Sequence, residues 1–441
     1  MFKTICLASI VLAGSARAQD LGAGNGPVDD PLLKELARVR ERVDALEKQS
    51  ASTGAPPTSS SVDLSAGELS SIGELHSDQV LARPWYENLE FSGYGAFTYL
   101  DTGGTGTNPG GSFLVKEASL FLNAQLTDHA FVYLETWLTR YLLDYGNEYW
   151  IGELYLQMTG IGARDTQPGV GFKFGRIDIP FGEDYLAQDA IDNPLITLSA
   201  ADPYGIDEGV LAYGSFGATH WVAALTNGNV ETGADDGSSK LVAGKVYGDV
   251  TPDVYLSASA LNTGETEMSA FKVGHLFLAP VGTFGASTAG TSPNTSVDST
   301  LWELDAKFGG ERTLGMALQG GQAYLNDHDD AFDRTLTWWQ IQPRVRIASD
   351  VELVARYSEV GTYDSEEGYI LSGKITADGD ALGYDASVMR RASLGVLWSW
   401  QPNIAFKAEL GHDWFELIDG SPFDTDNDER LFFAFEVDAS F

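Results

Sequence analysis

Apolar and polar side chains alternate with a period of two over most of the chain after residue 85. In the last twelve residues, RLFFAFEVDASF, alternate positions from Leu431 to Phe441 are apolar, whereas Glu436 and Asp438 share the opposite side. The same alternation recurs at 117–126, 132–139, 302–308 and 404–410. A period of two predicts β-strands with one apolar and one polar face.

The joints between the predicted strands alternate between short turns and long loops. We count seven short and eight long joints, and fifteen joints separate sixteen strands. Short turns on one side and long loops on the other are typical of an outer-membrane β-barrel. The stretch 267–280 also resembles a strand, but a seventeenth strand would invert every later turn, so we assign it to a long loop.

The predicted fold class is therefore all-β: a sixteen-stranded antiparallel transmembrane β-barrel over 85–441, preceded by a short α-helical coiled coil. Residues after the N-terminal leader contain no run of eighteen apolar residues, which excludes a membrane-spanning helix there. Sixteen strands leave room for an aqueous channel, toward which Glu436 and Asp438 would point. Five tryptophans near strand ends suggest an interfacial girdle: Trp137, Trp338, Trp398, Trp400 and Trp414.

The N-terminal part divides into three predicted segments. Residues 1–18 have the basic start, apolar core and Ala-x-Ala end of a secretory signal peptide. Residues 19–49 contain a helix whose apolar positions repeat at spacings of four and three, as in a coiled coil: Leu32, Leu36, Val39, Val43 and Leu46. A single amphipathic helix on the barrel or in the periplasm is the alternative. Residues 50–84 are a flexible linker rich in Ser, Thr and Pro.

Composition narrows the classes of function. The 441 residues carry a formal net charge of -36, which becomes -38 when Lys3 and Arg17 leave with the signal peptide, so nucleic acid is not an expected partner. The single cysteine, Cys6, lies in the signal. Residues 424–429 alternate acids as a calcium loop does, but Glu429 replaces the required glycine, and no metal site is expected. Without a G-x-S-x-G or H-E-x-x-H motif, neither enzyme activity nor a cofactor is expected.

A family resemblance follows from VGFKFGRIDIPFGEDY at 170–185, DNPLI at 192–196 and DEGVLAYG at 207–214. With the signal, coiled coil, linker and sixteen-strand pattern, these stretches resemble the phosphate-selective porin O/P superfamily, which includes porins with N-terminal coiled coils. The terminal Phe441 resembles the signal recognised by the barrel-assembly machinery. The resemblance implies a trimeric diffusion channel. Phosphate-selective members line the pore with a dense ladder of basic residues, which this chain lacks.

The long joint from Asp178 to Ile206 is the candidate constriction loop, because it carries several acids and no Lys or Arg. Alternation places four arginines on the inner wall, and charged groups at the narrowest point set the selectivity of a channel. Acids on the loop opposite arginines on the wall would produce a transverse field. Alternatively, these charges pair and hold the loop to the wall. The predicted pore-lining residues are Arg344, Arg346, Arg356, Arg391, Lys173, Glu183, Asp184, Asp189 and Asp192.

These patterns predict a porin of the bacterial outer membrane, with its coiled coil in the periplasm. Its expected partners are outer-membrane lipid, two further copies in a homotrimer and small hydrophilic solutes, including charged organic ones. The alternative is a non-conducting outer-membrane barrel that serves adhesion or envelope attachment. A barrel hydrolase is a third reading with no catalytic motif behind it.

Overall fold

The computed structural model describes most of the barrel. The described ranges are 88–102, 110–140, 150–163, 169–187, 189–201, 203, 205–228, 239–267, 296–310, 313–327, 334–361, 386–417 and 429–441. The predicted signal peptide, coiled coil and linker lie outside these ranges. Within them, no helix is long and apolar enough to cross a membrane.

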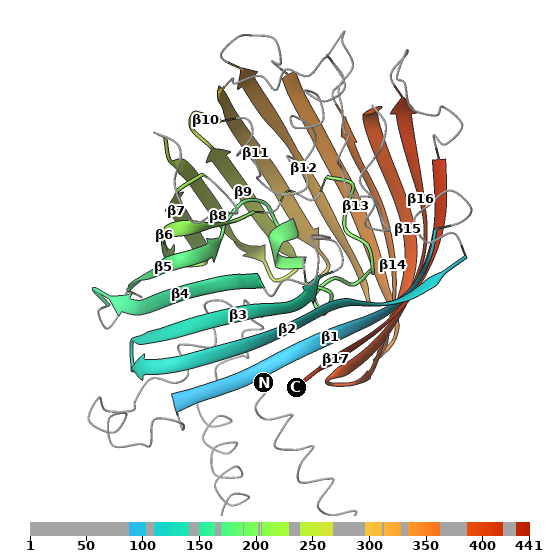
Figure 1. The fold of residues 1–441 in the computed structure, drawn as a ribbon, viewed down its shortest axis with the longest axis horizontal. Helices are drawn as coiled ribbons and strands as arrows, with labels where there is room; N and C mark the ends of the chain where they lie inside the picture. The colour runs from blue at the N-terminus through green and yellow to red at the C-terminus, as the bar shows by residue number, and fades with distance from the viewer. Residues whose placement is uncertain are drawn as a thin grey trace, which may run out of the picture. The chain divides into compact units, whose positions relative to one another are not determined.

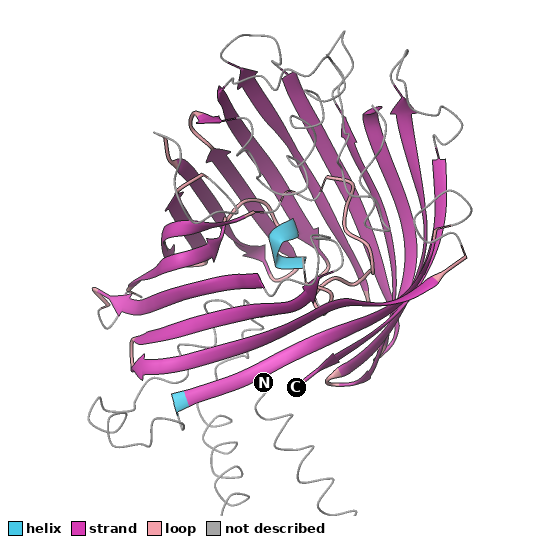
Figure 2. Ribbon diagram, viewed as in Figure 1, coloured by secondary structure: helices cyan, strands magenta, loops and turns pink. Residues whose placement is uncertain are grey.

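The described residues form one antiparallel sheet that closes on itself, because β1 pairs with both β2 and β17. Figures 1 and 2 show the strands side by side around this wall. The wall strands are β1 (Leu89–Asp101), β2 (Ser112–Thr127), β3 (Ala130–Arg140), β4 (Trp150–Ile161), β5 (Val170–Asp178), β6 (Ile206–Phe216), β7 (Thr219–Thr226), β8 (Leu241–Thr251), β9 (Val254–Asn262), β11 (Ser296–Phe308), β12 (Leu314–Asp327), β13 (Arg334–Ala348), β14 (Val351–Gly361), β15 (Ala386–Gln401), β16 (Ile404–Leu417) and β17 (Glu429–Ser440). The predicted all-β barrel of sixteen strands is confirmed.

One further strand, β10 (Thr266–Glu267), does not belong to the wall: it is a two-residue strand that pairs with the start of β11. Strands β9 and β11 pair directly with each other from Asn262 opposite Thr300 to Val254 opposite Phe308. No wall strand therefore stands between them, as the assignment of 267–280 to a loop predicts. Most of that stretch lies beyond the described residues.

The two faces of the wall follow the alternation in the sequence. On β17, Phe433 and Phe435 are 45% and 39% exposed on the outer face, whereas Glu436 is fully buried on the inner face. The inward direction of Glu436 and Asp438 agrees with the prediction. Their expected contact with water is wrong, because both carboxylates are covered inside the barrel.

Two of the five tryptophans assigned to the outer girdle face inward instead. Trp137 and Trp338 are buried, and each indole N–H donates a hydrogen bond of 2.6 Å to a carboxylate, Glu135 and Glu303 respectively. Trp398 and Trp400 are exposed on the outer face. The correction follows from the alternation itself: Trp338 shares its side of β13 with Gln340, and the apolar face passes through Trp339.

A β-bulge in β2 changes which residues face inward. Ala96 pairs with Glu117 and Phe97 with Val115, so Lys116 is the extra residue. A bulge lets two consecutive residues share one side of a strand. Both Lys116 and Glu117 therefore point into the barrel, where they contact the segment between β5 and β6.

Candidate functional site

The described residues between β5 and β6 (179–187, 189–201, 203 and 205) run inside the barrel, and we call them the inserted segment. Among its described residues the one regular element is the 3-10 turn η5 (Asp184–Ala187), which lies among the strands near the centre of Figure 1. Its hydrogen-bond partners are inward side chains of β2, β8, β9, β11, β13, β14, β15 and β16. The inserted segment is therefore fixed to the inner wall at several points.

The first anchor holds Gly182 and Glu183. The Gly182 N–H donates to Ser259 Oγ at 2.9 Å, and Lys245 Nζ donates to the Gly182 carbonyl at 2.6 Å. The Glu183 carboxylate forms ion pairs with Lys245 and Lys307 and accepts a hydrogen bond from Tyr255 Oη at 2.6 Å. Burial by itself would raise the pKa of Glu183, but the two lysines outweigh it and lower the pKa to about 2.

The low pKa of Glu183 predicts an acid-sensitive attachment. A carboxylate whose pKa falls on folding stabilises the folded state above its ordinary pKa of 4.5, and this contribution is lost as the pH falls toward about 2. We expect the open-channel conductance to stay constant from pH 7 to pH 5. Below about pH 4 the open-channel current should become noisy, because the segment detaches. Single-channel recordings across this range provide the measurement. In Glu183→Gln the unsteadiness should be present at pH 7, and an identical pH profile in both proteins would contradict the assignment.

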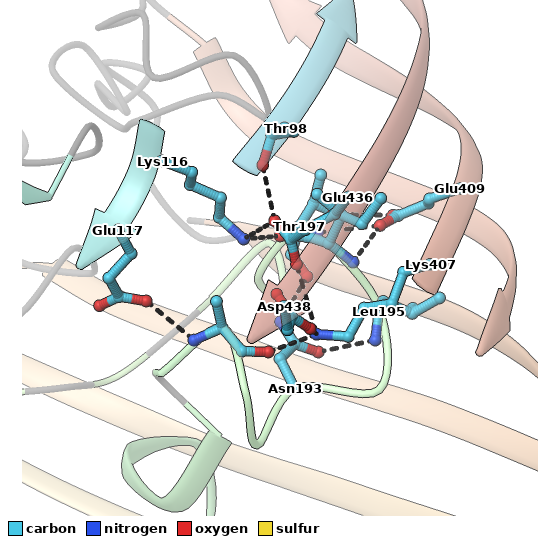
Figure 3. Close-up of polar contacts among 12 residues, drawn as sticks. Thr98, Lys116, Glu117, Asn193, Leu195, Thr197, Lys407, Glu409, Glu436 and Asp438 are labelled. Carbon is cyan, nitrogen blue, oxygen red and sulfur yellow. Dashed lines mark hydrogen bonds and ion pairs between the residues drawn. The ribbon is translucent and has the colours of Figure 1, made fainter. Parts of the chain in front are cut away.

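The second anchor, shown in Figure 3, holds residues 190–197 with charged groups of β2 and β16. Glu409 accepts hydrogen bonds from Ile196 N at 2.6 Å, Thr197 N at 2.8 Å and Thr197 Oγ1 at 2.6 Å. Lys116 Nζ donates to the Ile196 carbonyl at 2.6 Å. At Ala190, the N–H donates to Glu117 and the carbonyl accepts from Lys407.

Two further carboxylates hold the lysines of this anchor in place. Glu436 lies between Lys116 Nζ at 3.1 Å and Lys407 Nζ at 3.3 Å, and it accepts a hydrogen bond from Thr98 at 2.8 Å. Asp438 lies 2.6 Å from Lys407 Nζ. Buried charges persist when they are paired and hydrogen-bonded. The polar face of β17 thus supports the inserted segment indirectly.

The third anchor uses two of the predicted arginines. Arg356 donates to the Thr197 carbonyl at 2.7 Å and to Asn193 Oδ1 at 3.0 Å. Arg391 donates to the Leu198 carbonyl at 2.9 Å and forms a two-point pair with Asp413 at 2.7 and 3.0 Å. Both side chains bind the backbone of the inserted segment.

The acids of the inserted segment lie in different surroundings. Asp184 is half-buried and accepts hydrogen bonds from Ser199 Oγ at 2.7 Å and Gln340 Nε2 at 3.4 Å. Asp189 is half-buried, and its carbonyl caps a turn through the N–H groups of Asp192 and Asn193. Asp192 is exposed. Glu183 forms ion pairs with two lysines of the wall, Lys245 and Lys307.

The other three predicted basic residues lie away from the anchors. Arg344 donates to the Gly310 carbonyl at 2.8 Å, in the short turn between β11 and β12. Arg346 pairs with Glu352 at 3.1 Å, across the short turn between β13 and β14. Lys173 on β5 lies 3.9 Å from Glu153. The structure thus places Arg344 and Arg346 at the short-turn end, and their role in the pore stays a prediction.

The predicted site lacks several residues that hold the inserted segment: Lys116, Glu117, Lys245, Lys407 and Glu409. Strict alternation puts Lys116 on the outer face, so the bulge hides it. A signal for the bulge exists, because the exposed apolar side chains of β2 change from odd positions at Phe113 and Val115 to an even position at Leu120. The other four follow the expected alternation, but their contact with this segment depends on the folded loop.

Comparisons with known proteins support the fold. No protein-family model matches the chain, and no curated protein does. Solved structures similar to it include OmpT, an outer membrane protein of Vibrio cholerae, at 12% identity and a TM-score of 0.54 over 80% of this chain and 97% of that chain. The outer membrane channel DcaP of Acinetobacter baumannii has 12% identity and a TM-score of 0.53 over 80% and 97%. An anion-selective porin from Comamonas acidovorans has 11% identity and a TM-score of 0.51 over 80% and 99%.

These likenesses, together with the closed wall and the inserted segment, define the class of the molecule. It has the fold of a porin-type outer-membrane barrel. At such low identity the likeness concerns the fold alone. Membership of the phosphate-selective porin O/P superfamily stays a prediction, since no family model matches.

Proposed function

We propose that this protein is an outer-membrane porin through which small hydrophilic solutes diffuse, with the inserted segment as its constriction. The observation that carries the proposal is the attachment of the inserted segment at Gly182, Ile196 and Thr197 to the inner wall of a closed barrel of sixteen strands. A barrel of this size is wide enough for an aqueous channel. A segment attached across its interior narrows that channel and leaves the wall of strands intact.

Charged wall residues support the proposal through their pairing with the inserted segment. The buried lysines and arginines donate to its carbonyl groups, and buried glutamates accept from its N–H groups. Hydrogen bonds to charged groups contribute about 1.5–3 kcal/mol each. Several such bonds along one segment hold a passage of constant width, as a diffusion channel requires. The proposal includes no catalytic step and no cofactor.

The remaining features of the proposal concern assembly and placement. We place the barrel in the bacterial outer membrane, with its exposed apolar face against lipid. We further propose a homotrimer. A trimer form of Vibrio cholerae OmpT is among the similar solved structures, with a TM-score of 0.50. Arg344 and Arg346 would act near the periplasmic mouth in this arrangement.

Single-channel recording in a planar bilayer tests the proposed function. The purified protein in potassium chloride should insert in steps of uniform conductance, because a fixed constriction sets one pore width. A membrane that contains properly folded protein and shows no open-channel current would overturn the porin proposal. Refolded protein should be checked for β-sheet content by circular dichroism before the recording.

A further inference from the structure

A row of aromatic side chains crosses the inner wall from β1 to β4, and we call it the aromatic row. It consists of Tyr94, Phe121, Tyr133 and Tyr155, one from each strand. Neighbouring ring centroids are 5.8, 6.1 and 5.1 Å apart, and neighbouring planes are inclined by 30°, 19° and 24°. The rings therefore lie nearly parallel to one another along four consecutive strands.

The aromatic row faces the interior beside the inserted segment. The exposed side chains on these strands, such as Phe97, Leu120 and Leu154, occupy the opposite parity. Tyr94 packs with Ala190 of the inserted segment, which covers that end of the row. Phe121 and Tyr133 are only half-buried. Part of each of these two rings is therefore exposed on the inner side of the wall.

Carboxylates accompany the row on the same strands. Glu135 stands two residues from Tyr133 on β3, and Glu153 stands two residues from Tyr155 on β4, so each shares the inner face with its tyrosine. Aromatic faces carry negative electrostatic potential and attract cations. Partly exposed aromatic rings beside carboxylates favour a positively charged group that also has apolar surface.

The protein already places one ammonium group in this environment. Lys173 Nζ lies 4.1 Å from the centroid of the Tyr155 ring and 3.9 Å from Glu153 Oε1. This contact is independent of the ring spacing, and it shows that a primary ammonium fits between a face of the row and a carboxylate. Lys173 occupies the β5 end of the row and leaves the half-buried rings to other cations.

We propose that the aromatic row is a binding track for organic cations, such as small ammonium compounds, in the passage beside the inserted segment. The proposal rests on the proposed porin function and names the class of solute that the passage favours. Contact with the aromatic rings supplies affinity for the apolar part of the solute, and the carboxylates attract its charge. Contacts of this kind are weak enough for release, which conduction requires.

The experiment measures block of the potassium current by choline, with sodium and glucose as comparison solutes. Choline should reduce the current at a concentration at which sodium and glucose do not. Attraction by the carboxylates alone would act on sodium and choline alike, so equal effects of the two cations would overturn the proposal. Block by glucose at the same concentration as choline would also overturn it, because the track would then bind small solutes without regard to their charge.

Two variants with opposite expected effects sharpen the test. Tyr133→Leu removes a central ring, and we expect about three- to tenfold more choline for the same block. Lys173→Gln removes the resident ammonium from the Tyr155 face, and we expect choline to block at a lower concentration. The proposal fails if choline blocks the Tyr133→Leu variant at the same concentration as the unaltered protein. It also fails if Lys173→Gln requires more choline for the same block.

A matched control is available on the outer face of β5. Phe172 and Phe174 stack with ring centroids 6.1 Å apart and planes inclined by 20°, and Phe174 is exposed there. Phe174→Leu removes a ring from a similar pair on the lipid-facing side and should leave choline block unchanged. Loss of block in this control would show a general effect of aromatic loss and overturn the assignment. A chain that conducts without choline block refutes the track alone, whereas a folded chain without any current refutes the porin.

Discussion

Replacing Glu409 by alanine should release one end of the inserted segment and raise the single-channel conductance. The buried Glu409 carboxylate accepts three hydrogen bonds from Ile196 and Thr197. Their loss leaves buried N–H groups without an acceptor and costs roughly 3–5 kcal/mol in total. Since about 1.4 kcal/mol changes an equilibrium tenfold, the ratio of attached to detached segment should fall more than about a hundredfold. Conductance and current noise in a planar bilayer provide the measurement.

Two companion variants separate detachment from loss of charge. Glu352→Ala removes another inward carboxylate, one that pairs with Arg346 beside a short turn and has no described contact with the inserted segment. Its conductance should remain close to that of the unaltered protein. Glu409→Gln keeps an oxygen acceptor and should give an intermediate effect. If Glu409→Ala and Glu352→Ala change the current equally, Glu409 acts through its charge and does not hold the segment.

Replacing Gly182 by alanine should displace the other end of the inserted segment. Gly182 has a φ of +68°, where other residues are strained by about 1–2 kcal/mol, and a Cβ at this position would collide with the Glu303 carboxylate. The collision would separate Gly182 from Ser259 and Lys245 and disturb the pairing of Glu183. We expect a noisy channel of altered conductance and a folded barrel that unfolds at a lower temperature.

The chain offers a control with the same backbone strain. Gly217, in the short turn between β6 and β7, has a φ of +65°, and a Cβ there would meet no atom within 4 Å. Gly217→Ala should therefore lower stability slightly and leave the current steady. Equal currents from the two variants would show that the position of Gly182 against Glu303 does not determine the width of the passage.

The limits of the sequence as a guide to the site are visible in particular residues. Alternation predicts that Arg356 and Arg391 face the interior, and both bind carbonyl groups of the inserted segment. This contact corresponds to the alternative in which charges hold the loop to the wall. Sequence separation explains why alternation could not decide it: Arg391 and Leu198 are 193 residues apart. Alternation gives the side of a strand on which a residue lies, but not the loop that it meets.

The bulge at Lys116 and the inward tryptophans show a second limit. A period of two assigns every residue of a strand to one face, so a single extra residue reverses the assignment of all residues on one side of it. Residue type and nearness to a strand end predict that Trp338 belongs to the outer girdle. Its neighbour Trp339 holds the outer position, and Glu303 accepts the hydrogen bond from the buried indole of Trp338.

The sequence by itself determined the number of wall strands, the face on which most of their side chains lie and the loop that carries the candidate constriction. These properties follow from local periodicity and from the lengths of the joints, which are fixed by neighbouring residues. Only the tertiary structure decided that the inner carboxylates are covered, which charges hold the inserted segment and that four aromatic rings form a row. Each of these features depends on contacts between residues that are far apart in the sequence and form only when the barrel closes. Local periodicity contains no information about such contacts.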